Sequence, residues 1–179
     1  MRIISGKFKS RRIQAPKKLP ARPTTDFAKE ALFNIISHQY TFENIKVLDL
    51  FAGIGSISFE FGSRGTKNIV SVDSHYPTVQ FIKKTAKELN LPIKAVKSDV
   101  IKFLSNTKSQ FDIIFADPPY DFNVDNLSEI VQTIFKNNLL SKSGLLIVEH
   151  FKKTDVSGFL HYIQTKNYGS SAFSFFRNS

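Results

Sequence analysis

The chain has 179 residues, a formal net charge of +10 and 41% hydrophobic residues, which fits one domain with a sizeable core and leaves little room for a second. It has no cysteine, so disulfides and thiolate metal sites are excluded, and a cytoplasmic location is expected. No apolar run is long enough to span a bilayer, and the N-terminus lacks the apolar core of a secretory signal.

Positive charge is concentrated at the N-terminus. Residues 1–30 contain nine Lys or Arg against Asp26 and Glu30, which places +7 of the total +10 in this segment. A basic segment beside a nearly neutral body is typical of a protein that binds nucleic acid. Charge alone fits a solvated, solubilising segment equally well.

Residues 1–40 are predicted to form a basic extension packed on a core of residues 41–179, in a single domain overall. Residues 2–5 and 12–15 are typical of two short strands around a polar turn. Prolines then keep the chain extended, and Thr24 or Thr25 can cap a helix. The apolar residues of that helix have the spacing of a core-facing side: Ala28, Ala31, Leu32, Ile35 and Ile36.

The first strand of the core runs directly into a glycine turn and a helix. The stretch from Lys46 begins as a short apolar run that is typical of a buried strand, Gly53 and Gly55 permit a tight turn, and Ser56 is a candidate helix N-cap. This combination points free N–H groups at a ligand, as nucleotide-binding loops do. A plain tight turn is the alternative. A dinucleotide site fits less well, because Ser58 replaces the third glycine of G-x-G-x-x-G.

Two carboxylates near this turn indicate the kind of ligand. Asp73 ends the next predicted strand, about 20 residues beyond the glycines, where an acid accepts hydrogen bonds from ribose hydroxyls. It therefore favours a cofactor that contains adenosine. Asp49, directly before the turn, suits a cofactor with a cationic amino-acid end.

Strands and helices alternate through the rest of the core. Further strands are expected at 69–73, 93–97, 111–116 and 144–149, and helices at 56–64, 77–89, from 98, and across 127–135. This alternation predicts an open, mostly parallel α/β sheet that binds ligands at the C-terminal ends of its strands. Residues 159–165 and 171–176 are typical of an antiparallel hairpin with Gly169 in its turn.

The strand at 111–116 leads directly into Asp117-Pro118-Pro119-Tyr120. Two consecutive prolines cannot continue a strand ladder, so the chain leaves the sheet as a stiff, exposed loop. A rigid strand terminator would explain the prolines. It would not explain an acid before them and an aromatic residue after them.

These residues match a family pattern. Asp-Pro-Pro-Tyr resembles the [Asn/Asp]-Pro-Pro-[aromatic] loop of S-adenosylmethionine-dependent amino methyltransferases, and Asp49-Leu50-Phe51-Ala52-Gly53-x-Gly55 resembles their cofactor loop. Almost the whole chain resembles the RsmD family, through Arg2-Ile3-Ile4-Ser5-Gly6-Lys7, Arg22-Pro23-Thr24-Thr25-Asp26, Glu30-x-Leu32-Phe33-Asn34, Ser63-Arg64-Gly65 and Val148-Glu149. Phe27 and Asp73 depart from the pattern, where a basic residue and Glu are usual.

The resemblance implies a Rossmann-like class I methyltransferase fold with seven strands, and methylation of the exocyclic N2 of one guanine in 16S rRNA. S-adenosylmethionine would be the cofactor, a small-subunit ribosomal particle the partner, with no metal and a monomer as the default. The implied catalytic residues are Asp117, Pro118, Pro119 and Tyr120. The implied cofactor-binding residues are Asp49, Phe51, Gly53, Gly55, Asp73, Ser74, Asp99, Val100 and Asp117. The implied RNA-binding residues are Arg2, Lys7, Arg11, Arg12, Lys17, Lys18, Arg22 and Thr24.

Several alternatives stay open. A DNA adenine-N6 methyltransferase also uses Asp-Pro-Pro-Tyr, although the core leaves no room for a separate DNA-recognition domain. A non-catalytic RNA-binding assembly factor is another, although an intact loop at 117–120 argues against it. Asp99 can contact the adenine or simply cap a helix, and Glu149 can line the site or simply end a strand. The four histidines lack metal-ligand spacing and are interpreted as structural or surface residues.

Overall fold

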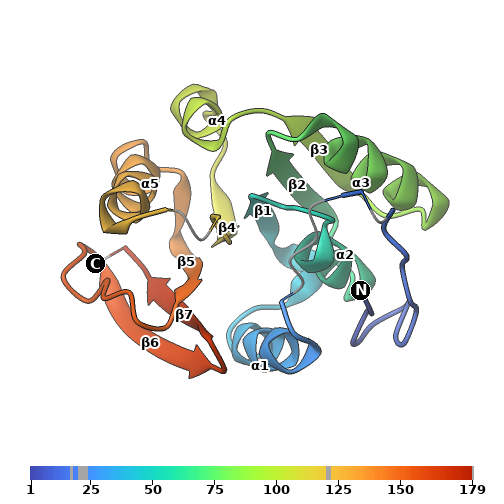
Figure 1. Cartoon of the computed structure of the whole chain (residues 1–179), viewed down its shortest axis with the longest axis horizontal. Helices are drawn as coiled ribbons and strands as arrows, with labels where there is room; N and C mark the ends of the chain where they lie inside the picture. Colours follow the sequence, from blue (N-terminus) through green and yellow to red (C-terminus); the bar gives the residue numbers. More distant parts are fainter. Residues whose placement is uncertain (17, 20–23, 120–121, 179) are drawn as a thin grey trace.

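The strands form a single mixed sheet in the part of the chain that the structure describes (Figure 1). This computed structural model describes residues 1–16, 18–19, 24–119 and 122–178. The strands are β1 (Lys46–Leu50), β2 (Asn68–Asp73), β3 (Ile93–Lys97), β4 (Phe111–Ala116), β5 (Leu140–Phe151), β6 (Tyr162–Tyr168) and β7 (Ser171–Phe176). The helices are α1 (Asp26–Ser37), the short 3-10 helix η1 (Phe42–Asn44), α2 (Ser56–Ser63), α3 (Tyr76–Glu88), α4 (Val100–Asn106) and α5 (Val124–Lys136).

The sheet has the order β3-β2-β1-β4-β5-β7-β6. Pairing is parallel from β3 to β5, whereas β7 runs antiparallel to both β5 and β6. This confirms the predicted mostly parallel sheet with a C-terminal antiparallel hairpin. Because the chain moves from β1 to β2 on one side and later returns to β4 on the other, the strand order reverses beside β1. Open α/β sheets bind ligands at such a point.

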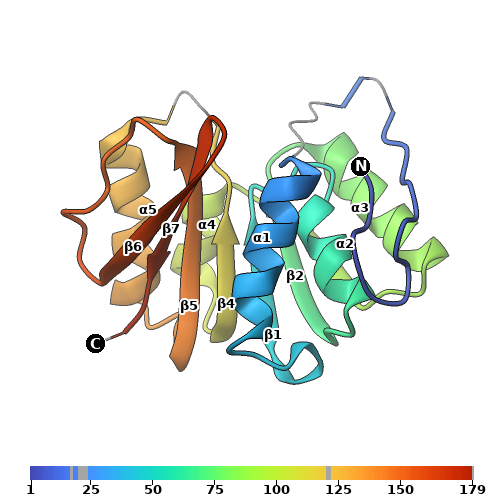
Figure 2. The ribbon, with the colours of Figure 1, turned by 90° about the horizontal axis from the view of Figure 1, so that it is seen from below.

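Helices cover both faces of the sheet (Figure 2). Helices α4 and α5 pack on one face with Ile114 of β4, whereas α1 and α2 pack on the other face with Ile113. Helix α3 lies beside α2 and packs on β3 through Val79 and Ile82. Burial on both faces explains why β4 is almost entirely apolar. Among the described residues, no helix is both long and apolar enough to cross a membrane.

The N-terminal segment differs from its predicted strand pair. Residues 2–5 and 12–15 share one isolated antiparallel bridge, between Arg2 and Arg12, and do not form strands. The physical reason is that the backbone N–H groups of Ile4 and Ser5 donate to the Glu60 carboxylate, at 2.8 and 3.0 Å, instead of to a neighbouring strand. A side chain of α2 therefore takes the place of further ladder bonds, while the Ile3 N–H still donates to the Arg11 carbonyl oxygen and the Ile13 N–H to the Met1 carbonyl oxygen, both at 3.0 Å.

Other element boundaries also shift. Strand β5 begins at Leu140, four residues before the predicted start, and its pairing with β4 is irregular near Phe111. The first hairpin strand was predicted at 159–165 but begins at Tyr162 and ends at Tyr168, with Gly169 in the turn at φ +64°. Local patterns predicted these strands but not their ends, because pairing with neighbours sets the ends.

The helix starts agree better with the sequence. Thr25 caps α1, since its hydroxyl accepts a hydrogen bond from the Ala28 N–H at 3.2 Å, and Pro77 lies in the first turn of α3. Ser56 was predicted to cap α2, but the N-cap is Gly55, which has a left-handed backbone and no capping side chain. A Cβ at Gly55 would lie 2.9 Å from the Phe59 ring, so packing against α2 favours glycine there.

Candidate functional site

A cleft of about 460 Å³ opens where the strand order reverses. Its walls are the loops that follow β1, β2, β3 and β4, together with the first turn of α3. The lining residues are Phe51, Gly53, Asp73, Ser74, His75, Thr78, Asp99, Val100, Asp117, Pro118 and Pro119. The size falls within the range of small-molecule sites, about 300–1,000 Å³. The position is the one that open α/β sheets use for ligands.

The cleft brings together most of the candidate cofactor residues and the Asp-Pro-Pro loop, but not all of them. Asp49 and Gly55 do not line it. Tyr120, Lys17 and Arg22 lie outside the described residues. Sequence reasoning missed His75 and Thr78, which do line the cleft. Their position shortly after Asp73, in the loop and helix start that follow β2, was the signal that could have found them.

The loop after β1 holds unusual backbone conformations. Phe51, Gly53 and Gly55 have φ angles of +56°, +52° and +80°. A left-handed backbone is natural for glycine but uncommon for phenylalanine, and such residues cluster at ligand sites. The Phe51 ring contacts the Phe122 ring edge-on, with centroids 5.4 Å apart. This contact joins the loop after β1 to the segment that follows the Asp-Pro-Pro loop.

Asp73 organises the edge of the cleft between β1 and β2. One carboxylate oxygen accepts a hydrogen bond from the Gly53 N–H at 2.9 Å, and the other accepts one from the His75 N–H at 2.8 Å. A carboxylate offers about four lone-pair sites. Asp73 can therefore fix the glycine loop and still accept hydrogen bonds from a ligand.

The charges around the cleft favour a cation. Asp73, Asp99 and Asp117 line it, and none of its described lining residues is Lys or Arg. Three carboxylates disfavour the pyrophosphate of a dinucleotide and favour a positively charged ligand. Asp99 also caps α4 by accepting a hydrogen bond from the Lys102 N–H at 2.9 Å. This residue therefore both caps a helix and lines the cleft.

Asp49 lies beneath the glycine loop. Its carboxylate is 2% exposed and accepts hydrogen bonds from the Ser58 N–H at 3.1 Å and the Ser58 hydroxyl at 2.5 Å. These bonds join the end of β1 to the first turns of α2. Burial raises the pKa of Asp49 to about 7, although the Ser58 bonds oppose the shift. This carboxyl group can therefore change its charge near neutral pH.

The raised pKa of Asp49 predicts a pH-dependent stability. Between the unfolded value of 3.8 and the folded value of about 7, the folded protein binds the extra proton, so stability is lost as the pH rises through this window. From about pH 5 to about pH 7.5 the titration of this group alone lowers the free energy of unfolding by about 2–3 kcal/mol. We expect Asp49→Asn to abolish that part of the pH dependence in urea unfolding. Parallel pH profiles of the variant and the original protein would contradict the expectation.

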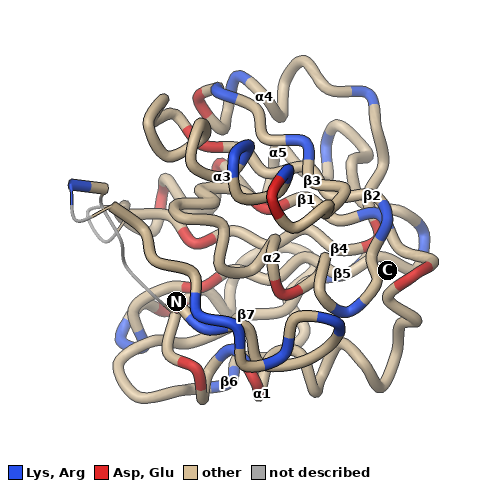
Figure 3. Tube along the Cα trace, turned by 90° about the vertical axis from the view of Figure 1, so that its right-hand side faces the viewer, with Lys and Arg blue, Asp and Glu red and all other residues tan. Residues whose placement is uncertain are grey.

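Basic residues lie along the N-terminal segment (Figure 3). We call residues 1–16 and 18–19 the basic arm. Arg2 forms an ion pair with Asp26 at 2.9 Å, and Lys7 and Arg11 lie over the Phe8 ring at 5.3 and 5.8 Å from its centroid. The side chains of Arg12 and Lys18 are exposed. These cations are accessible to a polyanion.

Thr24 has a different environment from the other candidate RNA residues. Its hydroxyl donates to a carboxylate oxygen of Glu149 at 3.0 Å. Glu149 is 2% exposed and lies within β5, so the interpretation of this acid as a strand-ending residue is wrong. It joins β5 to the residue that precedes the cap of α1.

Two buried charged side chains, Glu60 and Lys29, hold the backbone of the basic arm in place. Glu60 is fully buried and accepts the two arm N–H groups and the Arg64 guanidinium, at 2.9 Å. Lys29 is also buried, lies 3.8 Å from the Glu60 carboxylate and donates to the Arg2 carbonyl oxygen at 2.5 Å. Burial lowers the pKa of Lys29, while the charge of Glu60 opposes this shift. Side chains of α1 and α2 therefore fix where the arm begins.

Two similar known proteins carry rRNA methyltransferase names. A family described as "Conserved hypothetical protein 95" matches residues 1–177. The chain is 33% identical over 161 residues to "Putative rRNA methyltransferase YlbH" of Bacillus subtilis, covering 87% of this chain and 85% of the relative. It is 29% identical over 150 residues to "Ribosomal RNA small subunit methyltransferase D" of Escherichia coli K12, covering 83% and 74%.

A solved structure agrees with these relatives. "Putative methyltransferase yhhF from Escherichia coli" superposes with a TM-score of 0.84 and 26% identity, covering 99% of this chain and 97% of that one. The seven-stranded sheet described above is thus the Rossmann-like fold of class I methyltransferases, as the family resemblance implied.

Proposed function

Because this chain belongs to the family described as Conserved hypothetical protein 95, the RsmD family, we propose that it is a cytoplasmic rRNA methyltransferase. Its reaction would be the methylation of the exocyclic N2 of a guanine in 16S rRNA, with S-adenosylmethionine as the methyl donor. One observation carries the proposal: the glycine loop and the Asp-Pro-Pro loop line the same cleft. The substrate proposed is the rRNA of a small-subunit particle.

The residues of the cleft fit S-adenosylmethionine. When bound, this cofactor supplies an electrophilic methyl group on a positively charged sulfur, which is its own leaving group. Three lining carboxylates complement that charge. Asp73 would accept hydrogen bonds from the ribose, and Asp99 and Val100 would face the adenine. Phe51, Ser74 and the loop from Gly53 to Gly55 would surround the remainder, with Asp49 below the methionine end.

The Asp-Pro-Pro-Tyr loop would act on the acceptor base. An aromatic exocyclic amine is a poor nucleophile, because its lone pair is delocalised into the ring. The Asp117 carboxylate and the Pro118 carbonyl oxygen would accept its two N–H bonds and orient the nitrogen. Tyr120 would stack on the base, a contact worth about 1–3 kcal/mol in single-stranded recognition. Pro118 and Pro119 would keep the loop rigid, so catalysis here is mainly alignment and charge placement.

The basic arm would bind RNA phosphates beside the cleft. Its accessible cations, Arg11, Arg12 and Lys18, come from the segment that holds +7 of the net charge. The target guanine would have to leave its stack to enter the cleft. A held arm beside an open cleft supports an RNA substrate over a free nucleoside.

Methyl transfer tests the proposal directly. Tritiated S-adenosylmethionine is supplied with small-subunit particles, naked 16S rRNA or duplex DNA, and the modified nucleoside is identified after digestion. We expect incorporation into rRNA as N2-methylguanine. Incorporation into DNA adenine would replace the proposal with a DNA methyltransferase. No incorporation into any substrate by folded protein would leave a non-catalytic assembly factor.

A further inference from the structure

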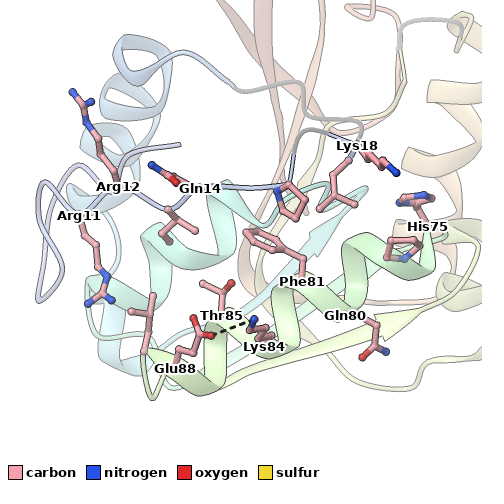
Figure 4. Close-up of a pocket in the computed structure, with 15 residues that line it drawn as sticks. Arg11, Arg12, Gln14, Lys18, His75, Gln80, Phe81, Lys84, Thr85 and Glu88 are labelled. Atoms are coloured by element: carbon pink, nitrogen blue, oxygen red, sulfur yellow. Dashed lines mark ion pairs between the residues drawn. The ribbon is translucent and has the colours of Figure 1, made fainter.

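A second cavity, of about 710 Å³, lies between the basic arm and α3. The arm contributes residues between Arg11 and Leu19, and α3 contributes residues between Pro77 and Glu88. We call this cavity the arm groove. Figure 4 shows Phe81 pointing from α3 toward the arm, with Lys18 and His75 at one end. None of the interactions proposed above occupies the floor of this groove.

The floor of the arm groove is aromatic and its walls are basic. Phe81 is partly buried against the core cluster that contains Val79 and Ile82. The described charged lining residues are four cations and one carboxylate: Arg11, Arg12, Lys18, Lys84 and Glu88. Lys84 lies 3.9 Å from that carboxylate, and both side chains are more than half exposed. The groove thus carries an excess of positive charge.

An aromatic floor with cationic walls is the chemistry of a site for unpaired nucleotides. Bases stack on an aromatic ring whatever their sequence, and basic side chains neutralise the phosphates. Duplex RNA offers no base face for such a contact. The basic walls and the Phe81 ring therefore complement the phosphates and bases of single-stranded RNA.

The arm groove and the cleft share a lining residue. His75 lines both cavities. Its position is fixed, because its N–H donates to Asp73 and its ring Nδ1 lies 2.5 Å from the Thr78 hydroxyl. A strand that leaves the cleft at His75 can therefore enter the groove without crossing the sheet.

We propose that the arm groove binds an unpaired nucleotide of the RNA substrate, next to the nucleotide that enters the cleft, with its base on Phe81 and its phosphate near Lys18 and Lys84. This inference rests on the proposed function for the identity of the cleft ligand. It adds a second nucleotide site, and it makes α3, as well as the arm, part of the RNA-binding surface. It also implies that the region around the target guanine is single-stranded.

Binding of an oligouridine of about ten nucleotides, within the usual size of single-strand sites, tests the groove without any methyl donor. Fluorescence anisotropy is measured over a range of salt concentrations. Phe81→Leu keeps an apolar side chain but removes the ring face, so affinity should fall about fivefold or more at an unchanged salt slope. Lys84→Ala should lower the slope of log K against log salt by about 0.7.

Lys83→Ala is the matched control. Lys83 is exposed on the same helix but does not line the groove, so this change removes the same charge and should leave affinity and slope unchanged. A duplex of the same length should bind more weakly than the single strand. Equal slopes for Lys84→Ala and Lys83→Ala, full affinity in Phe81→Leu, or no binding of the oligonucleotide would overturn the proposal.

Methyl transfer by the unsubstituted protein, measured in parallel, separates the two proposals. Transfer to rRNA together with unaltered oligouridine binding by Phe81→Leu and Lys84→Ala would overturn the groove alone. The opposite outcome is also possible: the two variants lose oligouridine binding, and the unsubstituted protein transfers no methyl group to any RNA. That result would uphold the groove as a single-strand site and overturn the proposed reaction.

Discussion

Replacing Asp117 by alanine is expected to lower kcat for methyl transfer at least about a hundredfold, the usual cost of removing one preorganised hydrogen-bonding group from an active site. Asp117 lines the cleft at the end of β4, where its carboxylate would accept an N–H bond from the guanine amine. Without it the amine is held by the Pro118 carbonyl alone. Single-turnover transfer to rRNA measures the effect, and calorimetry with S-adenosylmethionine should show that cofactor binding survives.

Asp117→Asn is the control that separates two roles of this residue. An amide oxygen still accepts an N–H bond but does not take up a proton near neutral pH. The family pattern permits Asn at this position. We therefore expect Asp117→Asn to retain transfer within about tenfold of the original rate if Asp117 only orients the amine. A loss as large as that of Asp117→Ala would assign Asp117 as a base, and full activity in Asp117→Ala would show that the reaction occurs elsewhere.

The central sheet could be predicted from the sequence because its signals are local. Apolar runs such as the one that begins at Lys46 and the one at 111–116 are followed closely by glycine or proline, and the strand at 111–116 has its predicted ends. The N-terminal strands could not be predicted, because the Ile4 and Ser5 N–H groups are taken by Glu60, more than fifty residues away in sequence. Long-range side-chain contacts of this kind leave no periodic pattern.

The candidate site shows the same division. Asp73 and the Asp-Pro-Pro loop were found because each directly follows a strand, and parallel strands bring their C-terminal ends together. His75 and Thr78 were missed, since His75 has no metal-ligand spacing and was interpreted as structural, although both residues follow Asp73 closely in the chain. Asp49 was placed near the ligand by its motif, but its side chain turns toward Ser58 beneath the loop. Sequence order does not give the direction of a side chain within a motif.

Buried Glu60 also accounts for the second large effect that we expect. Its carboxylate accepts hydrogen bonds from Ile4, Ser5 and Arg64, which are all donors, and it lies close to the buried ammonium of Lys29. In Glu60→Gln one acceptor oxygen becomes an NH₂ group, so at least one donor faces another donor. The positive charges of Lys29 and Arg64 also lose their buried partner.

Breaking a buried, hydrogen-bonded ion pair by changing one partner costs about 3–5 kcal/mol, a large part of the stability of an average domain, about 5–15 kcal/mol. We expect Glu60→Gln to lower the free energy of unfolding in urea by that amount. The Ile4 and Ser5 amides should also lose protection from hydrogen exchange. Glu88→Gln is the control, because its exposed pair with Lys84 should contribute less than about 1 kcal/mol. If Glu60→Gln were as stable as this control, α2 would not be what holds the arm, and the arm groove would lack a fixed wall.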